Sequence, residues 1–502
     1  MKYKIYLIFI LSLICCINIF SQPKREMRGV WVAVVENIDW PSSPTETSGE
    51  QISELVKLFD KLKAVGINTI FFQVRIECDA LYKSSFEPWS FWLTGKQGKA
   101  PDPYYDPLEF AINEAHSRGM ELHAWINPYR AVKNTSAYEN SRNHISKTHP
   151  EWILQFGKLK ILNPGIPEVT NYIVKIVRDI VSRYSVDGIH FDDYFYPYSP
   201  TITNEDSATF RIYKGMFTNI DDWRRNNINS MIAKVYDTIN KINPKIQFGV
   251  SPFGIVENKY ANTKGFNSYN KIYCDPLTWI KEKTVDYIIP QLYLEIGNKY
   301  ADFKKLLPWW ASIKDERQIY AGLSSIKMAS PSWEGSPSEL YDEIRMVRQY
   351  KNVDGIVFYR AKSIVENFSG LADTLKNSFF KYPAFVPVME WKNFNTPLAP
   401  SNLIVEGNDS SRILKWLNPN KDSALSYVIY RFPDSKEIDL TNPENILKTI
   451  RNNTFFIDNT LIENKNKITY VITSLTNEQI ESIDYAIGSI YLNSGVRKPV
   501  KE

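Results

Sequence analysis

The chain has 502 residues, of which 43% are hydrophobic and 14% aromatic, and its formal net charge is +4 at pH 7. This length gives room for two or three domains, and the composition is typical of a globular protein with a sizeable core. The small net charge and the lack of a basic stripe in the sequence argue against nucleic acid as a partner.

The first 21 residues predict a signal peptide. Lys2 and Lys4 form a basic start, the apolar run Ile5–Phe20 follows, and Ser21 is a small residue at the end. An apolar run of about 16 residues is short for a membrane span, and no later stretch of sequence is long and apolar enough to cross a bilayer. We therefore expect a protein exported to the periplasm, the cell envelope or the extracellular space, with no transmembrane segment.

The four cysteines predict no disulfide framework. Cys15 and Cys16 end the apolar core of the leader and permit a lipoprotein, but the bulky residues before them disfavour lipidation. Cys78 and Cys274 remain once the leader is removed, and we expect two isolated thiols rather than a bridge.

From residue 26 to residue 375, segments typical of strands alternate with segments typical of helices. The expected strands are near-continuous apolar runs at Met27–Val35, Asn68–Val74, Glu121–Asn127, Asp187–Asp192, Ile246–Ser251, Val285–Gln291, Gln318–Leu323 and Asp354–Tyr359. Helical spacing lies between them at Gln51–Val65, Leu108–Ser117, Glu168–Tyr184, Asp222–Ile242, Pro276–Lys283, Phe303–Ile313 and Ser338–Tyr350. Eight apolar strands separated by helices predict an α/β fold, the (β/α)8 TIM barrel. Asp187 and Asp354 both open strands within Val-Asp-Gly-Ile, and we expect both to be structural.

The last part of the chain changes character. Residues 381–400 are rich in proline and aromatics without periodicity, which predicts a linker lying on the barrel. Between residues 400 and 492, turn signals separate short alternating strands at Asn402–Val405, Arg412–Trp416, Ser426–Arg431, Phe455–Asp458, Ile468–Ser474 and Ser482–Tyr491. The pattern predicts an all-β sandwich of the immunoglobulin-like kind. The segment resembles a fibronectin type III domain in its aromatic positions, namely Trp416, Tyr427, Tyr430 and Tyr470.

The stretch "DGIHFDDYFYP" (187–197) carries the strongest functional signal. Alternation along the strand places His190, Asp192 and Tyr194 on the inner face of the barrel, and Asp193 lies past the last ladder bond. A strand that ends in two carboxylates is unusual, because buried charge is costly without a partner. Active sites of such barrels lie at the carboxyl ends of the strands, and paired acids are the groups that cleave glycosidic bonds.

Polar residues also gather at the ends of the other strands. They include Gln73, Arg75, Glu77, Asp79, His123, Trp125, Asn127, Tyr129, Arg130, Ser251, Gln291, Tyr293, Glu295, Tyr359 and Arg360. A core needs none of these residues, so together they indicate one site, although each alone could serve a loop hydrogen bond. Arg75 and Arg130 are candidates to keep a carboxylate ionised. His123 and His190 are candidates to bind sugar hydroxyls or to orient an acid.

Aromatic residues in the expected loops are candidates to stack on pyranose rings. They are Trp89, Trp92, Tyr104, Tyr105, Tyr194, Tyr196, Trp309 and Trp310. For Trp309 and Trp310, packing of a helix against the barrel explains the pattern equally well.

The chain resembles the glycosyl-hydrolase-like 10 family over roughly residues 26 to 375. The pieces that carry the resemblance include "RGVWVAVV" (28–35), "FFQVR" (71–75), "HAWINPYR" (123–130), "DGIHFDDYFYP" (187–197), "FGVSPFGI" (248–255) and "YIIPQLYL" (287–294). Cys78 stands where we expect a glycine and Leu294 where we expect an aromatic residue. The resemblance implies a (β/α)8 glycosidase-type domain and, through relatives that act on peptide-free peptidoglycan, a glycan substrate of that class.

These observations predict a glycoside hydrolase that acts on an N-acetylated bacterial polysaccharide. Asp192 is the expected nucleophile or stabiliser of positive charge, and the proton donor is expected among Asp193, Glu295, Asp79 and Glu77. Two adjacent acids also suit substrate-assisted catalysis. The expected substrate-binding residues are Arg75, Trp89, Trp92, His123, Asn127, Tyr129, Arg130, His190, Tyr194, Gln291 and Tyr293. We expect a monomer with no metal and no cofactor.

Two alternatives remain open at this point. A metal-dependent polysaccharide deacetylase also carries an Asp-Asp pair. Its metal ligands here would be His144 and His149, but their spacing of five does not place them on one helix face. A glycan-binding barrel without catalysis is the other alternative, since a fold does not guarantee activity.

Overall fold

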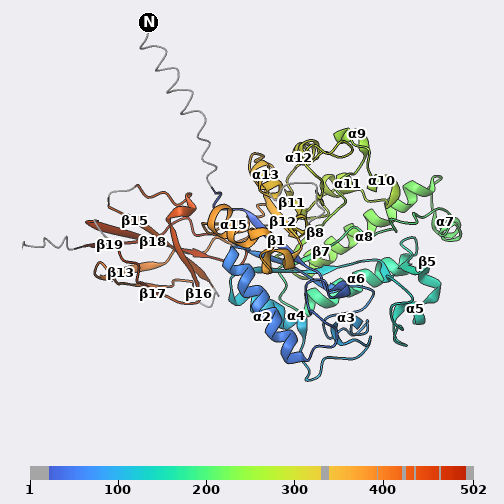
Figure 1. Ribbon diagram of the computed structural model, residues 1–502, viewed down its shortest axis with the longest axis horizontal. Coiled ribbons are helices and arrows are strands. Elements are labelled where there is room, and N and C mark those ends of the chain that lie inside the picture. Colours follow the sequence, from blue (N-terminus) through green and yellow to red (C-terminus); the bar gives the residue numbers. More distant parts are fainter. Residues whose placement is uncertain are drawn as a thin grey trace, which may run out of the picture.

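The computed structural model describes residues 22–329, 338–392, 394–420, 425–434, 437–462 and 465–492. The leader predicted over residues 1–21 lies outside these ranges. Figure 1 shows a barrel surrounded by helices and, at its left, a β-domain packed against one end. In the described part of the chain, no helix combines the length and the apolar character needed to cross a bilayer.

The barrel wall is a parallel sheet with the order β10-β9-β8-β7-β3-β2-β1-β12-β11. Its strands are β1 (Met27–Val32), β2 (Thr69–Arg75), β3 (Glu121–Ile126), β7 (Gly188–Phe191), β8 (Gln247–Val250), β9 (Tyr287–Ile288), β10 (Gln318–Ile319), β11 (Ala321–Ser324) and β12 (Gly355–Tyr359). Tyr320 alone separates β10 from β11, so these two are one interrupted strand, and β10 pairs with β9 while β11 pairs with β12. Within the described residues the predicted eight-stranded (β/α)8 barrel is therefore confirmed.

The helices of the outer layer begin and end within about three residues of the predicted bounds. They are α2 (Ser48–Val65), α4 (Pro107–Ser117), α6 (Pro167–Arg183), α8 (Ile220–Ile242), α11 (Pro276–Lys281), α12 (Phe303–Ser312) and α13 (Ser338–Val347). Local sequence fixes their ends. Thr47 and Glu50 form a reciprocal capping box at the start of α2, and Gly66 ends it at a φ of 102°, which a residue with a side chain rarely adopts.

A small antiparallel sheet in the loop after β3 was not predicted. Its order is β4-β6-β5, from β4 (Arg130–Val132), β5 (Ile153–Phe156) and β6 (Leu159–Leu162). These strands have only three or four residues each, too few for a periodic pattern to stand out. The sheet matters because it holds Arg130 and Leu159 beside the mouth of the barrel.

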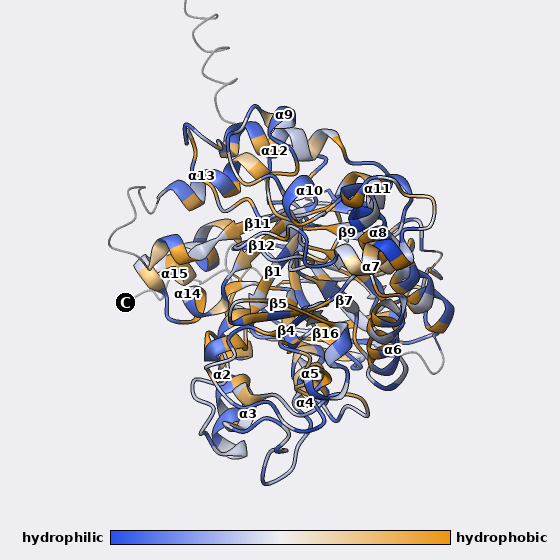
Figure 2. Cartoon of the chain, turned by 90° about the vertical axis from the view of Figure 1, so that its right-hand side faces the viewer, coloured by the Kyte–Doolittle hydropathy of each residue, from blue (hydrophilic) through white to orange (hydrophobic). Residues whose placement is uncertain are grey.

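Large rings fill the barrel interior, and glycines on neighbouring strands make room for them. A Cβ atom on Gly188 would lie 2.3 Å from Nδ1 of His123, and one on Gly249 would lie 2.1 Å from Cε2 of Tyr287. Figure 2 views the barrel from the end away from the β-domain and shows mainly apolar strands inside a ring of helices with polar outer faces. The interior is thus a packed core rather than a pore.

At the amino end of the barrel, aspartates tie neighbouring strands together. Asp187 accepts a hydrogen bond from the backbone N–H of Leu122 at 2.7 Å, and Asp354 accepts one from Ile319 at 3.1 Å. The structural role predicted for both aspartates is confirmed.

The C-terminal domain is a sandwich of two antiparallel sheets, β13-β14-β17 and β16-β15-β18-β19. The strands are β13 (Ser401–Gly407), β14 (Arg412–Leu417), β15 (Ser426–Pro433), β16 (Ile446–Arg451), β17 (Phe455–Asp458), β18 (Lys467–Leu475) and β19 (Ala486–Tyr491). Trp416, Tyr427 and Tyr470 are buried in one cluster between the sheets. The sandwich is as predicted, apart from β16, which was not expected, and a last strand that begins at Ala486 rather than Ser482. The likeness to a fibronectin type III domain stays a prediction.

The tight fit of the interior rings makes a stability prediction. Gly249→Ala should destabilise the fold by about 1–3 kcal/mol or more, because the new methyl group would collide with the buried Tyr287 ring. The free energy of unfolding in urea measures this change. Gly49→Ala is the matched control, since Gly49 lies in α2, a methyl group added there would meet no atom within 4 Å, and alanine favours helix. Equal stability of both variants would contradict the packing account.

Candidate active site

A cavity of about 610 Å³ opens at the carboxyl end of the barrel strands. Side chains from most of the strands and the loops after them line it, among them Trp31, Gln73, Trp125, Arg130, Lys133, Asp192, Tyr194, Tyr198, Ser251, Gln291, Tyr293 and Tyr359. Most of these are aromatic or polar and uncharged. Asp192 is the one carboxylate among the residues that line this cavity.

Asp192 follows β7 and points into the cavity, as alternation along the strand predicted. Its side chain is 4% exposed, and its Oδ2 accepts a hydrogen bond from Nε1 of Trp125 at 2.9 Å. Burial raises the pKa of Asp192 to about 7, with the nearby charge of Arg130 acting in the opposite direction. Near neutral pH this carboxyl group can therefore hold a proton and release it.

Asp193 lies next to Asp192 but is fully buried behind the cavity wall. Its Oδ1 accepts hydrogen bonds from the hydroxyl of Tyr198 at 2.5 Å and from Nε2 of Gln291 at 3.1 Å, and its Oδ2 has no partner among the described residues. Burial raises the pKa of Asp193 to about 6, and these two hydrogen bonds oppose the rise. Asp193 thus reaches the cavity through Tyr198 and Gln291, which do line it.

Two cationic side chains border the cavity beside the acids. The guanidinium carbon of Arg130 lies 4.8 Å from the centre of the Tyr194 ring, a cation–π distance. Lys133 pairs with Glu36 at 2.7 Å, and both side chains are more than a third exposed. Lys133 is neutralised by this pair, whereas no ion pair of Arg130 is present among the described residues, so Arg130 supplies the positive charge on this side of the cavity.

A chain of hydrogen bonds through the barrel interior fixes the floor of the cavity. The indole N–H of Trp31 can only donate, so Nε2 of His190 at 3.1 Å must accept and the His190 proton sits on Nδ1. That Nδ1 faces the hydroxyl of Tyr287 at 3.3 Å, and the same hydroxyl lies 2.8 Å from Nδ1 of His123. Burial lowers the pKa of His190 well below its usual range, which keeps the ring neutral. The interior histidines thus hold Trp31 in place.

The structure brings nine of the residues predicted for the site to the cavity, namely Gln73, Trp125, Arg130, Asp192, Tyr194, Ser251, Gln291, Tyr293 and Tyr359. His123 and His190 do not reach it, because both are fully buried in the barrel below Trp31. Their predicted contact with sugar hydroxyls is therefore replaced by the supporting role described above.

The predicted residues after β2 also lie away from the cavity. Arg75 is buried and pairs with Glu87 at 2.7 Å, so it does not hold a cavity carboxylate ionised. Asp79 is fully buried and accepts hydrogen bonds from Gln97 and from the backbone of Glu77. Glu77 is likewise buried, bound by Tyr138 and the backbone of Lys133. These groups organise the loop after β2, where each carboxylate finds a local donor.

The remaining predicted residues are structural neighbours of the site. Asn127 accepts from the backbone N–H of Arg130 at 3.0 Å and so shapes the turn that presents that arginine. Tyr129 is buried against Phe195. Trp89, Trp92 and Glu295 do not line the cavity: the first packs edge-on against Tyr104, the second packs against Phe91 and Tyr138, and Glu295 accepts from Asn298 at 3.4 Å.

Sequence reasoning missed Trp31, Lys133 and Tyr198. Trp31 has a detectable signal, because alternation along β1 places it on the same inner face as Met27. Tyr198 lies in an irregular loop, and only its contact with Asp193 reveals its role.

No three His, Cys, Asp or Glu side chains come together as metal ligands in the described ranges. His144 is buried and faces the backbone oxygen of Glu77 at 2.8 Å, while His149 stacks on Trp152 and pairs with Glu151. The two histidines offered for a deacetylase thus have other partners.

The chain matches a protein-family model and several known proteins. The family model described as glycosyl hydrolase-like 10 matches residues 26–337. Glycosyl hydrolase YngK from Bacillus subtilis is 37% identical over 482 residues, which cover 92% of this chain and 93% of that protein. Glycosyl hydrolase DigH from Escherichia coli K12 is 38% identical over 370 residues, 68% of this chain and 84% of that protein. A solved structure of the PgaB (BpsB) glycoside hydrolase domain from Bordetella bronchiseptica covers 70% of this chain and 99% of its own, with 13% identity and a TM-score of 0.45.

The hydrogen bond from Trp31 to His190 makes a first prediction for the site. His190→Phe should leave the buried indole N–H without an acceptor and lower the free energy of unfolding by about 1–3 kcal/mol. Urea unfolding followed by tryptophan fluorescence measures the loss. His149→Phe, at an exposed histidine, is the control, and His190→Gln should recover part of the loss because it retains an acceptor. A His190→Phe chain as stable as the wild type would refute the tautomer assignment.

The raised pKa of Asp192 makes a second prediction. The pKa of Asp192 is about 7 in the folded chain and about 3.9 in the unfolded chain. Its contribution to stability is therefore full below about pH 4 and is lost as the pH rises through about 7. Asp192→Asn cannot lose a proton, so its melting temperature relative to wild type should be higher at pH 8 than at pH 5. Asp237→Asn, on the exposed side of α8, is the control; a pH-independent difference for Asp192→Asn would contradict the assignment.

Proposed function

Because the chain belongs to the glycosyl hydrolase-like 10 family, we propose that it is a secreted glycoside hydrolase that cleaves an N-acetylated bacterial glycan. One observation carries the proposal: Asp192, with a pKa of about 7, faces a cavity lined by aromatic rings. Ring faces bind the apolar faces of sugars, and a carboxyl group that keeps its proton near neutral pH is the general acid that glycoside cleavage requires.

In the proposed reaction, Asp192 donates its proton to the glycosidic oxygen as the bond from that oxygen to the anomeric carbon breaks. This differs from the sequence-based expectation, which made Asp192 the nucleophile or the stabiliser of positive charge; the raised pKa favours the role of acid. Water then adds to the anomeric carbon, and its proton returns to the Asp192 carboxylate. The products are two shorter glycans, one with a new reducing end.

The partner of Asp192 in catalysis is proposed to be the acetamido group of the substrate. A mechanism with two protein carboxylates needs both beside the sugar, yet Asp193 is screened from the cavity by Tyr198 and Gln291. In substrate-assisted cleavage the acetamido oxygen instead bonds to the anomeric carbon as the glycosidic oxygen leaves, and this new bond breaks when water adds to the same carbon. Asp193 would fix the Tyr198 hydroxyl and the Gln291 amide, which line the cavity, in the orientation that holds this acetamido group.

The substrate is proposed to be peptidoglycan glycan that has lost its stem peptides. Removal of the peptide frees the lactyl carboxylate of each N-acetylmuramic acid, whereas a peptide-bearing strand has a neutral amide at that position. Arg130 borders the cavity with positive charge that a free carboxylate can meet. Export by the predicted leader would deliver the protein to the compartment that holds this polymer.

The proposal predicts loss of turnover in Asp192→Asn with the fold retained. Without an acidic proton at this position, the rate on peptide-free peptidoglycan should fall by about 100-fold or more. New reducing ends measure the rate, and circular dichroism checks the fold. Wild-type activity should decline as the pH rises above about 7, because the acid loses its proton.

Asp237→Asn is again the control and should keep full activity. Peptidoglycan with intact stem peptides should be cut more slowly than the peptide-free polymer. A wild-type chain that binds these glycans but releases no reducing ends would instead support the alternative of a binding protein without catalysis.

A further inference from the structure

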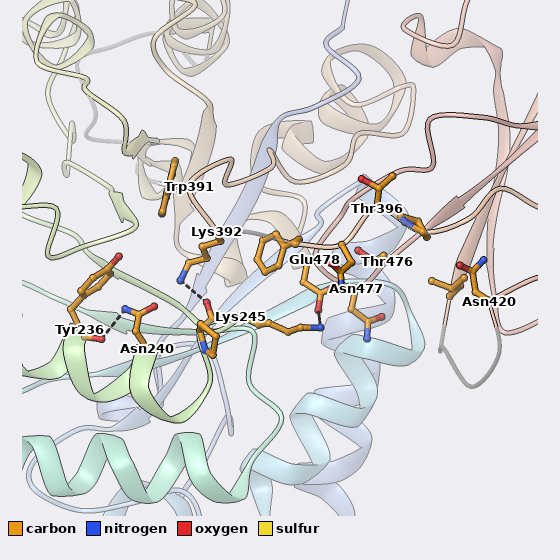
Figure 3. Close-up of a pocket in the computed structure, with 15 residues that line it drawn as sticks. Tyr236, Asn240, Lys245, Trp391, Lys392, Thr396, Asn420, Thr476, Asn477 and Glu478 are labelled. Carbon is orange, nitrogen blue, oxygen red and sulfur yellow. Dashed lines mark hydrogen bonds and ion pairs between the residues drawn. The ribbon is translucent and has the colours of Figure 1, made fainter.

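A second cavity, of about 730 Å³, lies where the barrel meets the sandwich domain (Figure 3). The end of α8, the linker and the loop after β18 enclose it. Its lining residues are Tyr236, Asn240, Pro244, Lys245, Trp391, Lys392, Phe394, Asn395, Thr396, Pro397, Asn420, Leu425, Thr476, Asn477 and Glu478. None of them lines the active-site cavity described above.

This cavity lies at the end of the barrel opposite to Asp192. Pro244 and Lys245 directly precede β8, and Trp391 donates a hydrogen bond to Asp286, which directly precedes β9. Asp192 instead directly follows β7. The barrel strands β1, β2 and β3 have six or seven residues and so span about 20 Å from one end of the barrel to the other, so one small ligand cannot occupy both places.

The walls combine flat apolar surfaces with uncharged polar groups. Tyr236, Trp391 and Phe394 supply rings, and Figure 3 shows Tyr236 and Trp391 on the barrel side of the cavity. Asn395 and Asn477 are exposed, and their side-chain amides have no hydrogen-bond partner in the described part of the chain. Rings beside free amides suit sugars, which present an apolar face and a rim of hydroxyl and acetamido groups.

The charged groups of the cavity neutralise each other within the protein. Lys245 pairs with Glu478 at 2.6 Å across the junction, and Lys392 pairs with Asp286 at 3.0 Å while donating to the backbone oxygens of Pro244 and Ile246. Neither lysine is left to hold an anion, which disfavours phosphate or nucleic acid as the occupant. The walls therefore select a neutral polar ligand.

The cavity continues along the junction, which gives it the shape of a groove. A neighbouring hollow of about 340 Å³ shares Lys245, Phe394, Asn477 and Glu478 with it. A third hollow, of about 360 Å³, shares Asn477 with both and adds Lys63, Lys448 and Arg451 to the wall, so the neutral lining belongs to the first cavity. A ligand that follows all three must be elongated, as a polysaccharide chain is.

We infer that this junction groove is a second glycan-binding site, which holds a neutral stretch of N-acetylglucosamine-type oligosaccharide away from the active site. The inference rests on the proposed function, because it assigns to the groove the same class of polymer that the cavity cleaves. Binding there would keep the enzyme on a long or insoluble glycan between cleavage events. It also gives the sandwich domain and the linker a role in substrate binding.

Isothermal titration with the hexamer of N-acetylglucosamine tests the site. The Asp192→Asn chain is used so that the probe is not consumed, and two oligosaccharides should bind per chain. Adding Asn395→Ala and Asn477→Ala, or Phe394→Ala in a separate chain, should remove one of the two or weaken it about tenfold. Trp391 is left intact because it bonds the barrel. Asn226→Ala, on the exposed side of α8 outside the groove, is the control.

The outcomes separate this inference from the proposed function. Unchanged binding in both groove variants, or no binding of the hexamer at all, would overturn the inference, whatever the activity of the wild type. Groove-dependent binding in a chain that cuts no glycan would support the inference and overturn the proposed hydrolysis. Chains that carry the same groove substitutions but keep Asp192 should cleave short soluble oligomers at the wild-type rate but insoluble polymer several-fold more slowly. Thermal melting of each variant confirms that the domains remain folded.

Discussion

Burial of Asp192 at the mouth of a filled barrel is the constraint on which the site depends. A carboxylate in that position would normally be neutralised by an ion pair, but no cation lies within ion-pair distance of Asp192 among the described residues, and Trp125 offers only one hydrogen bond. The free energy that a buried charge would cost appears instead as affinity for a proton. The rings that exclude water from this carboxyl group are also the surfaces on which a sugar can lie, so one arrangement provides both acidity and binding.

Contacts through the barrel interior fix side-chain positions from its amino end to its mouth. Gly188 and Gly249 leave space for the rings of His123 and Tyr287, and these hold His190 and, through it, Trp31. The indole N–H of Trp31 can only donate, and this fixes which atom donates in each hydrogen bond below it. The core therefore does more than fill volume, because it fixes the orientation of the cavity floor.

The sequence was sufficient to predict the barrel, since eight apolar strands with helices between them admit few other arrangements. It also placed Asp192 correctly, because alternation within a strand needs no tertiary information. Arg75 and Asp79 were misplaced for a different reason. Arg75 is the last residue of β2 and Asp79 lies in the loop after it, and groups at a strand end can turn toward local partners such as Glu87 and Gln97, which nothing in their spacing shows. The β4-β6-β5 sheet and Tyr198 escaped prediction because short irregular segments carry no period.

The aspartates at the amino end of the barrel are held by backbone N–H groups and ion pairs, whereas Asp192 at the carboxyl end has no ion pair among the described residues. This difference explains why only the carboxyl end suits catalysis. At the amino end, Asp187, Asp286 and Asp354 each accept a backbone N–H of a neighbouring strand, and Lys392 and Lys314 add ion pairs. At the carboxyl end the strands terminate, and Asp192 accepts one hydrogen bond from Trp125 and a long one, of 3.5 Å, from the backbone N–H of Tyr194. Its pKa therefore stays raised by burial. The amino end of the barrel can bind a neutral polymer through rings and amides. The carboxyl end, which holds the acid Asp192, can also break a bond within such a polymer.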